Sequence, residues 1–264
     1  MSNPPSASLL GLDLAWSTRN PTGACALDSA GRVVDERMLE SDDEIIDWVA
    51  RHLAERAVVA IDAPLQVPNE TGRRPCENEL HREYGSRRAG PHASNRSRLV
   101  ATHGAIRGED LAARLADLDF GGPWAGRDRT VLEVYPHPAI IETFELPERL
   151  VYKAKRGVSV DRRRQGLRKL ARLVDSLATA SPPFVAPTIS IGEDVKGAAL
   201  KLIEDRLDAR LCAWIAAVWN AAPERMRLFG DAATGHIAVP IGRPPSSRNP
   251  DGSEIVVHHN LPGD

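Results

Sequence analysis

Leu9 to Trp16 reads LLGLDLAW, an almost continuous apolar run into which one charged residue, Asp13, is set. Such a run is typical of a β-strand that is buried on both faces. Desolvating an unpaired carboxylate costs several kcal/mol, so Asp13 should be matched by hydrogen bonds, a cation or a metal ion. A simpler interpretation stays open, in which Asp13 caps the end of the strand before the polar residues 18–21.

A second stretch, from Ala57 to Leu65, repeats this pattern. It reads AVVAIDAPL, in which a β-branched run leads to Asp62 and Pro64 then ends the strand. In open α/β sheets, ligands bind at the carboxyl edge of the strands. Two buried strands that each deliver an aspartate near this edge therefore predict one shared site.

A third buried strand is predicted from Thr130 to Pro136, again with a single internal acid, Glu133. Its apolar neighbours resemble those of the first two strands, so we take Glu133 as a candidate further member of the acidic site. The alternative is that the Glu133 side chain lies on the solvent side of an edge strand, where a carboxylate needs no partner.

The clearest helix is predicted from about Val195 to Ala221. Its apolar residues recur at spacings of three and four and form one stripe that should pack on the sheet. At about 100° per residue, Asp208 and Glu204 fall within about 95° of the middle of this stripe, whereas Asp205 lies roughly 155° away. We therefore expect Asp208 and Glu204 to look across the sheet edge and Asp205 to face solvent.

The other elements complete an α/β fold with a mixed five-stranded sheet. Two further strands, 22–28 and 32–40, should form an antiparallel meander with the first one. A helix over 41–55 follows and opens with the capping pattern SDDE. A strand that follows a helical crossover usually runs parallel to its neighbour, so the Asp62 strand should lie beside the Asp13 strand.

The chain is predicted to form one domain over residues 9–241. The first residues, 1–8, are expected to be disordered, and 242–264 is a polar tail with partial disorder. Regular alternation is lost over 68–129, which is rich in Arg, Gly, Pro, Ser and His. We interpret this segment as a helical or loop insertion over the carboxyl edge. A last short strand is predicted near 235–241.

Composition is that of a globular protein without a membrane anchor. The chain has 264 residues with 42% hydrophobic content, enough for one ordinary core. The three cysteines, Cys25, Cys76 and Cys212, show no CxxC spacing, which fits a reducing compartment and argues against a thiolate zinc site. No uncharged apolar stretch of about 18 residues exists, so we expect a cytoplasmic protein without a membrane partner.

Charge is segregated along the chain although the net charge is only -2. The first 70 residues hold twelve acidic and five basic side chains, whereas 73–107 holds eight arginines and 153–172 holds nine basic residues against one acid. Basic flanks around an acidic core would suit a phosphate-containing polyanion. The candidate phosphate contacts are Arg87, Arg88, Lys153 and Lys155. Solvated faces of arginine-rich helices remain an alternative for either run.

Four short segments carry a family resemblance. They are 11–16 (GLDLAW), 61–65 (IDAPL), 133–136 (EVYP) and 205–209 (DRLDA). In their order and spacing these segments resemble the family catalogued as domain of unknown function 429, whose members are regarded as predicted RNase-H-like nucleases. The resemblance covers most of residues 9–241.

This resemblance implies an RNase-H-like sheet with a carboxylate cluster that binds one or two divalent ions and hydrolyses phosphodiester bonds. By position, Asp13, Asp62 and Asp208 would correspond to the core acids, with Glu133 as a less certain catalytic fourth and Glu204 as a further metal ligand. Clustered carboxylates without His or Cys suit Mg²⁺ or Mn²⁺ rather than zinc. The substrate would be nucleic acid or another phosphodiester.

Two other functions remain open. A non-catalytic RNase-H-like scaffold or binding protein could keep the acids as hydrogen-bond acceptors, and metal binding would separate it from a nuclease. A nucleotide-binding phosphotransferase of the actin and sugar-kinase kind would share the Gly-x-Asp strand. That fold needs two similar halves, whereas this chain has no internal repeat, and Ala15-Trp16 replaces the Gly-Thr turn that would contact phosphate.

Overall fold

The computed structural model describes residues 7–242. Its centre is a five-stranded sheet with the order β3-β2-β1-β4-β5. The first three strands form an antiparallel meander, and β4 and β5 run parallel to β1. The strands are β1 (Ser8–Asp13), β2 (Thr22–Leu27), β3 (Val33–Leu39), β4 (Ala57–Ile61) and β5 (Arg129–Glu133). The mixed α/β sheet predicted from the sequence is therefore confirmed.

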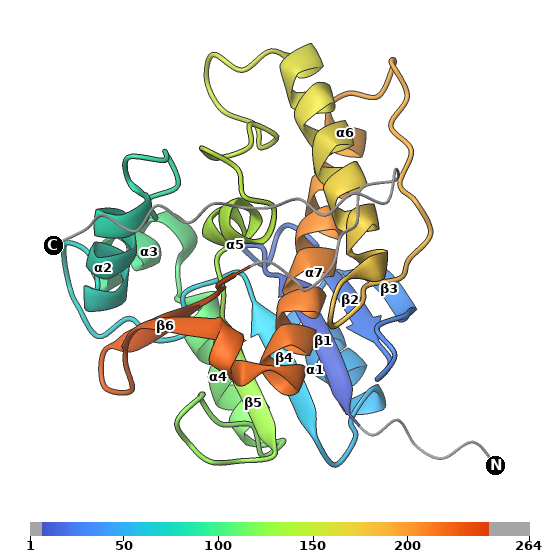
Figure 1. The fold of residues 1–264 in the computed structure, drawn as a ribbon. Coiled ribbons are helices and arrows are strands. Elements are labelled where there is room, and N and C mark those ends of the chain that lie inside the picture. Colours follow the sequence, from blue (N-terminus) through green and yellow to red (C-terminus); the bar gives the residue numbers. More distant parts are fainter. Residues whose placement is uncertain (1–6, 243–264) are drawn as a thin grey trace, which may run out of the picture.

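Helices cover both faces of this sheet (Figure 1). Successive strand residues point to opposite faces, so Leu9 packs with α7 and α6, whereas its neighbour Leu10 packs with α1 and α4. We call these the α7 face and the α1 face. The helices are α1 (Asp42–Arg51), α2 (Pro75–Tyr84), α3 (Arg96–His103), α4 (Arg107–Ala116), α5 (Pro136–Thr143), α6 (Val160–Ser176) and α7 (Ala198–Ala221), with single 3-10 turns at Leu177–Thr179 and Pro223–Arg225.

The helix predicted over 41–55 is α1, and Ser41 caps its start as expected. Ser41 Oγ accepts a hydrogen bond from Glu44 N at 3.2 Å, and Glu44 Oε2 accepts one from Glu40 N at 2.8 Å. The helix ends at Arg51, earlier than predicted. Trp48 is fully buried on the α1 face, so the apolar stripe packs as its spacing indicated.

Helix α7 approaches the sheet very closely at two glycines. A Cβ atom on Gly11 would lie 2.1 Å from the backbone N of Ala213, and one on Gly23 would lie 2.5 Å from the carbonyl oxygen of Asp205. Real Cβ atoms do not come this near to backbone atoms, so only glycine allows the approach. As a result, Asp208 in the middle of α7 is brought beside the end of β1.

The segment 68–129 is an insertion only in its first part. It contains α2, α3 and α4, and Leu111 and Leu115 of α4 are buried on the α1 face of the sheet together with Trp48. Helix α4 is thus the crossover that a parallel connection from β4 to β5 needs. The predicted insertion is therefore too long, because α4 belongs to the core.

A hairpin of β6 (Met226–Asp231) and β7 (Gly235–Pro240) follows α7 and forms a separate two-stranded sheet. The strand predicted near 235–241 is β7, whereas β6 was not predicted. Phe229 and Ile237 of this hairpin pack with Leu80 of α2. The hairpin therefore supports the insertion, and Figure 1 shows it beside α2.

The predicted start of the ordered domain was slightly too late. Ser8 begins β1 and Ala7 is buried, so the first strand starts within the stretch 1–8 for which we expected disorder. Residues 1–6 and nearly all of the predicted polar tail, 243–264, lie outside the described residues. Within 7–242, none of the helices combines the length and apolar character that crossing a bilayer requires.

Candidate metal centre

Three carboxylates from distant parts of the chain meet at the carboxyl edge of the sheet. Asp13 ends β1, Asp62 directly follows β4, and Asp208 lies in the middle of α7. One carboxylate oxygen from each side chain lies within 4.8 Å of those of the other two. The structure thus brings together the three aspartates that the sequence patterns predicted to share a site.

The register of the sheet explains this meeting. Leu12 of β1 pairs with Ile61 of β4, and the Asp62 amide donates to the Leu12 carbonyl oxygen at 2.9 Å. The residues that follow, Asp13 and Asp62, therefore lie side by side and point to the α7 face. The close contact of α7 with Gly11 then places Asp208 over them.

A lysine already lies among these carboxylates. Lys153 Nζ is 3.0 Å from Asp208 Oδ2 and 3.5 Å from Asp62 Oδ2. On the other side, the Tyr152 hydroxyl donates to Asp208 Oδ1 at 2.8 Å. Asp208 Oδ2 is buried and has no hydrogen bond of good geometry despite its ion pair with Lys153. A divalent cation that bound this oxygen would have to displace the Lys153 ammonium.

Burial and mutual repulsion make the ionised form of the cluster costly. Burial, together with the charge of Asp208, raises the pKa of Asp13 well above its ordinary value. Burial also raises the pKa of Asp208, and it raises that of Asp62 to about 6 although Lys153 opposes the shift. The charges of Asp208 and Asp62 outweigh burial at Lys153 and raise its pKa, so the lysine is a cation.

The donor set fits a hard divalent cation. When all three carboxyls are ionised, they and the Lys153 ammonium group leave two negative charges in a largely buried place. Oxygen ligands of this kind are those that Mg²⁺ and Mn²⁺ prefer. If a cation binds here, Asp13, Asp62 and Asp208 are the residues that would hold it.

Glu133, the predicted fourth acid, is held elsewhere. Arg74 donates to both of its carboxylate oxygens, at 2.8 Å from Nη1 to Oε2 and 2.5 Å from Nη2 to Oε1. The Leu65 amide donates to Oε2 as well, at 2.9 Å. Glu133 pairs with Ile61, one residue before Asp62, so its side chain points to the α1 face. Its inclusion in the acidic cluster is therefore corrected.

Glu204 and Asp205 also differ from expectation. Glu204 is buried one helical turn before Asp208, but it pairs with Arg163 at 2.9 Å and with Lys201 at 3.1 Å, and it lies outside the cluster of three carboxylates. Asp205 is 6% exposed rather than facing solvent, and it forms an ion pair with Lys201. The prediction from helical angles was wrong for Asp205 because β2 also packs against α7 near Gly23.

The predicted phosphate contacts divide into two groups. Arg87 pairs with Glu142 at 2.8 Å and Arg88 with Glu148 at 3.4 Å, so their charges are already matched. Lys153 lies in the acidic cluster itself, and Lys155 is exposed on the same loop. Of the four, only the two lysines lie on the loop that reaches the carboxylates.

The comparison with known families gives one match. The family model described as "Protein of unknown function (DUF429)" matches residues 11–234. The chain belongs to the DUF429 family. No curated protein and no solved structure matches it. The DUF429 region includes the three clustered aspartates and Lys153, so the candidate metal centre lies wholly within the part of the chain that defines the family.

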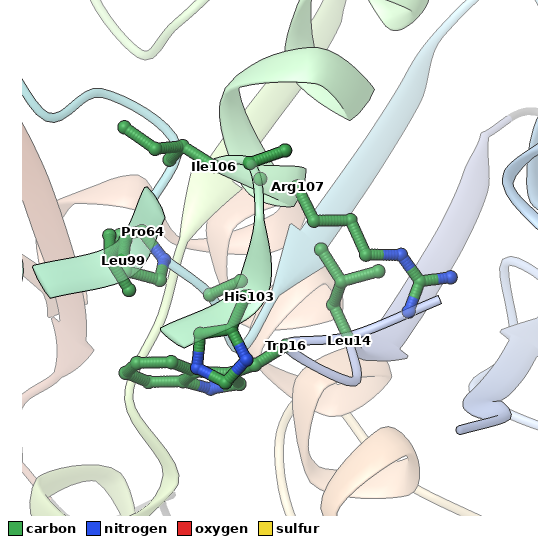
Figure 2. Close-up of a pocket in the computed structure, with 10 residues that line it drawn as sticks. Leu14, Trp16, Pro64, Leu99, His103, Ile106 and Arg107 are labelled. Atoms are coloured by element: carbon green, nitrogen blue, oxygen red, sulfur yellow. The ribbon is translucent and has the colours of Figure 1, made fainter. Parts of the chain in front are cut away.

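The DUF429 domain also has pockets around this site that the sequence patterns missed. One pocket is lined by Asp62 together with Trp16, His92 and Tyr135. A second, smaller pocket lies between Trp16 and α3, and Figure 2 shows the His103 ring against the Trp16 indole there. Trp16 was visible in the sequence three residues after Asp13, whereas nothing in the sequence placed His92 near this edge.

Proposed function

We propose that this protein is a divalent-metal-dependent nuclease that hydrolyses phosphodiester bonds at Asp13, Asp62 and Asp208. The observation that carries the proposal is the group of three carboxylates at the sheet edge, each with an oxygen within 4.8 Å of those of the other two. Bound Mg²⁺ or Mn²⁺ would supply activation of water and stabilisation of the leaving oxygen. The site lies at the carboxyl edge of the sheet, where α/β folds bind ligands.

The topology supports the same proposal. The strand order β3-β2-β1-β4-β5, with acids at the ends of β1 and β4 and on a late helix, is the arrangement expected of an RNase-H-like fold. Basic side chains also lie beside the cluster: Arg149, Lys153 and Lys155 all act on the nearby His137. Carboxylates surrounded by basic groups suit a substrate with a phosphodiester backbone.

Each of the five residues at the site has a role in this proposal. The three aspartates bind the cation, and Tyr152 orients Asp208 through its hydroxyl donor. Lys153 Nζ offsets part of the negative charge of the site when no metal is present. With a divalent cation bound by the aspartates, like charges would repel, and Lys153 would be available to contact a phosphate oxygen of the substrate.

The first test is a Mn²⁺ titration by calorimetry of the wild type and of Asp13→Asn. We expect micromolar to low-millimolar binding in the wild type and at least a tenfold loss in the variant, because one charged ligand is removed. Asp47→Asn is the matched control, since Asp47 is exposed on α1. Cleavage of labelled single-stranded DNA and RNA should then require Mn²⁺ or Mg²⁺ and Asp13. Absence of Mn²⁺ binding by the wild type would refute the metal-dependent mechanism.

A second candidate function is a non-catalytic binding protein, favoured by the ion pairs of Lys153. An ammonium group between Asp62 and Asp208 can serve as a permanent structural counter-ion. Such a site would need no metal and would persist as it is. The Lys153 variant described next separates the two candidates.

Replacing Lys153 with methionine should tighten Mn²⁺ binding about tenfold or more, because a competing positive charge within about 4 Å of two ligands is removed. Calorimetry at pH 7.5 measures the change. Lys155→Met is the matched control, because Lys155 is exposed and lies two residues further along the same loop. Unchanged or weaker Mn²⁺ binding in Lys153→Met would show that Lys153 is a structural counter-ion, as the second candidate requires.

A further inference from the structure

Trp16 is an exposed aromatic residue held in a fixed place beside the acidic cluster. It follows Asp13 by three residues and is 39% exposed. The His103 ring packs edge-on against it with 5.6 Å between ring centroids. Leu14, Pro64 and Leu99 line the space around these two rings, as Figure 2 shows.

The larger pocket extends from Trp16 to the catalytic edge. Trp16, Asp62 and Pro64 form one part of its wall. Pro91 and His92 from the insertion also line it. Because Asp62 belongs both to this pocket and to the carboxylate cluster, a ligand in the pocket would be next to the reacting group.

The chemistry of the wall suits a flat heteroaromatic ring. Proline and tryptophan surfaces can cover the faces of such a ring, and Ser94, His92 and Tyr135 offer hydrogen-bonding groups at its edge. Partial burial, followed by nearby positive charges, lowers the pKa of His92. Its imidazole is therefore neutral at pH 7 and can both donate and accept a hydrogen bond.

Positive charge surrounds the same pocket. Four basic residues lie near enough to His92 to act on its pKa: Arg98, Lys155, Arg149 and Arg73. They come from the insertion and from the loop that carries Lys153. A pocket that suits a heteroaromatic ring and lies near basic side chains and a carboxylate cluster matches the base and the phosphates of a nucleotide in a single-stranded nucleic acid.

We propose that the pocket lined by Trp16 and Asp62 is a base-binding subsite, and that the substrate is therefore single-stranded nucleic acid. An unpaired base stacks on the Trp16 indole, and the adjoining phosphodiester reaches the three aspartates. A base within a duplex is paired and stacked on both sides, so it does not enter the pocket. This inference rests on the proposed nuclease function for the role of the carboxylates, but base binding itself is measurable without cleavage.

The test compares binding of three fluorescein-labelled 12-mers without divalent metal: single-stranded DNA, the same sequence as a blunt duplex, and a strand of abasic sites. Trp16→Ala should weaken binding of the normal single strand about tenfold, the usual order for loss of one stacking contact. It should leave the abasic strand unchanged. Trp16→Phe, which keeps an aromatic face, should restore most of the affinity.

Trp124→Ala is the matched control. Trp124 is exposed to a similar degree, 47%, and packs edge-on against His236 at 5.5 Å, but it lines a different pocket. It should not change binding of any of the three probes. An equal loss for the abasic strand, or wild-type preference for the duplex, would overturn the base-binding subsite.

Failure of the subsite and failure of the nuclease proposal give different results. Mn²⁺ calorimetry of Trp16→Ala should match the wild type, because Trp16 is not among the clustered carboxylates. If Trp16→Ala weakens binding of the single-stranded 12-mer but the wild type binds no Mn²⁺, the base-binding subsite is supported and the nuclease proposal is refuted. If Mn²⁺ binds but strand binding ignores Trp16, the subsite falls alone.

Discussion

Replacing Arg74 with methionine should lower the free energy of unfolding by about 3–5 kcal/mol, the usual cost of breaking a buried ion pair from one side. Arg74 is 1% exposed and contacts two buried acids, Glu133 and Glu77. It also donates to the Gln66 carbonyl oxygen at 3.0 Å. Methionine fills a similar length but leaves both carboxylates without their cation, so the carboxyl edge should loosen together with the start of α2.

Urea unfolding followed by circular dichroism measures this change. Arg73→Met is the matched control, because Arg73 is the exposed neighbour of Arg74 in the same loop, and it should change stability by less than about 0.5 kcal/mol. The double variant Arg74→Met with Glu133→Gln should recover part of the loss, since a neutral amide is cheaper to bury than an unpaired charge. A loss below about 1 kcal/mol in Arg74→Met would contradict the central place given to this ion pair.

The metal-free protein should lose roughly 3 kcal/mol of stability through Asp62 as the pH rises from 4 to 7. A carboxyl whose pKa is raised from 3.8 to about 6 by folding binds its proton more tightly in the folded state. Its favourable contribution is complete below pH 4 and is lost as the pH rises through 6. The raised pKa values of Asp13 and Asp208 act in the same direction.

Mn²⁺ should reverse this loss at pH 7 and have little effect at pH 5, where protons occupy the carboxylates. Thermal unfolding of wild type and Asp62→Asn, with and without Mn²⁺, measures both effects. The difference between the two proteins isolates Asp62 from groups such as Glu36, whose pKa is lowered and whose contribution to stability grows with pH. A wild type that gains stability relative to Asp62→Asn between pH 4 and 7 would contradict the prediction.

The sequence was sufficient to place the acids at the ends of β1 and β4 and on α7, because each pattern indicates where its side chain points. A buried run followed by Asp13 or Asp62 identifies the end of a strand, and the spacing of apolar residues orients Asp208. The prediction for Glu133 was wrong by one position in the strand. In the third strand the acid comes one position before the point that corresponds to Asp62, and a shift of one residue moves a side chain to the opposite face.

The remaining features depend on contacts between segments with no regular pattern. Lys153 and Tyr152 lie on an irregular loop, so only the packing of that loop on α7 brings them to Asp208. Arg74 reaches Glu133 from 59 positions away in the sequence. Strand β6 includes two charged residues and a glycine with positive φ, which weakens the alternation that would have revealed it.

The two glycines under α7, Gly11 and Gly23, determine both how the helix packs on the sheet and how far apart the carboxylates lie. The spacing of the carboxylates is set by backbone touching backbone at Gly11 and Gly23, and no flexible side chain lies between to adjust it. If the cluster binds a cation as proposed, its affinity can hardly be tuned by moving the helix, because any added carbon would lift α7 and open the core along with the site. Under the proposed function, changes in affinity would come from residues beside the cluster that do not hold the helix on the sheet, such as Lys153.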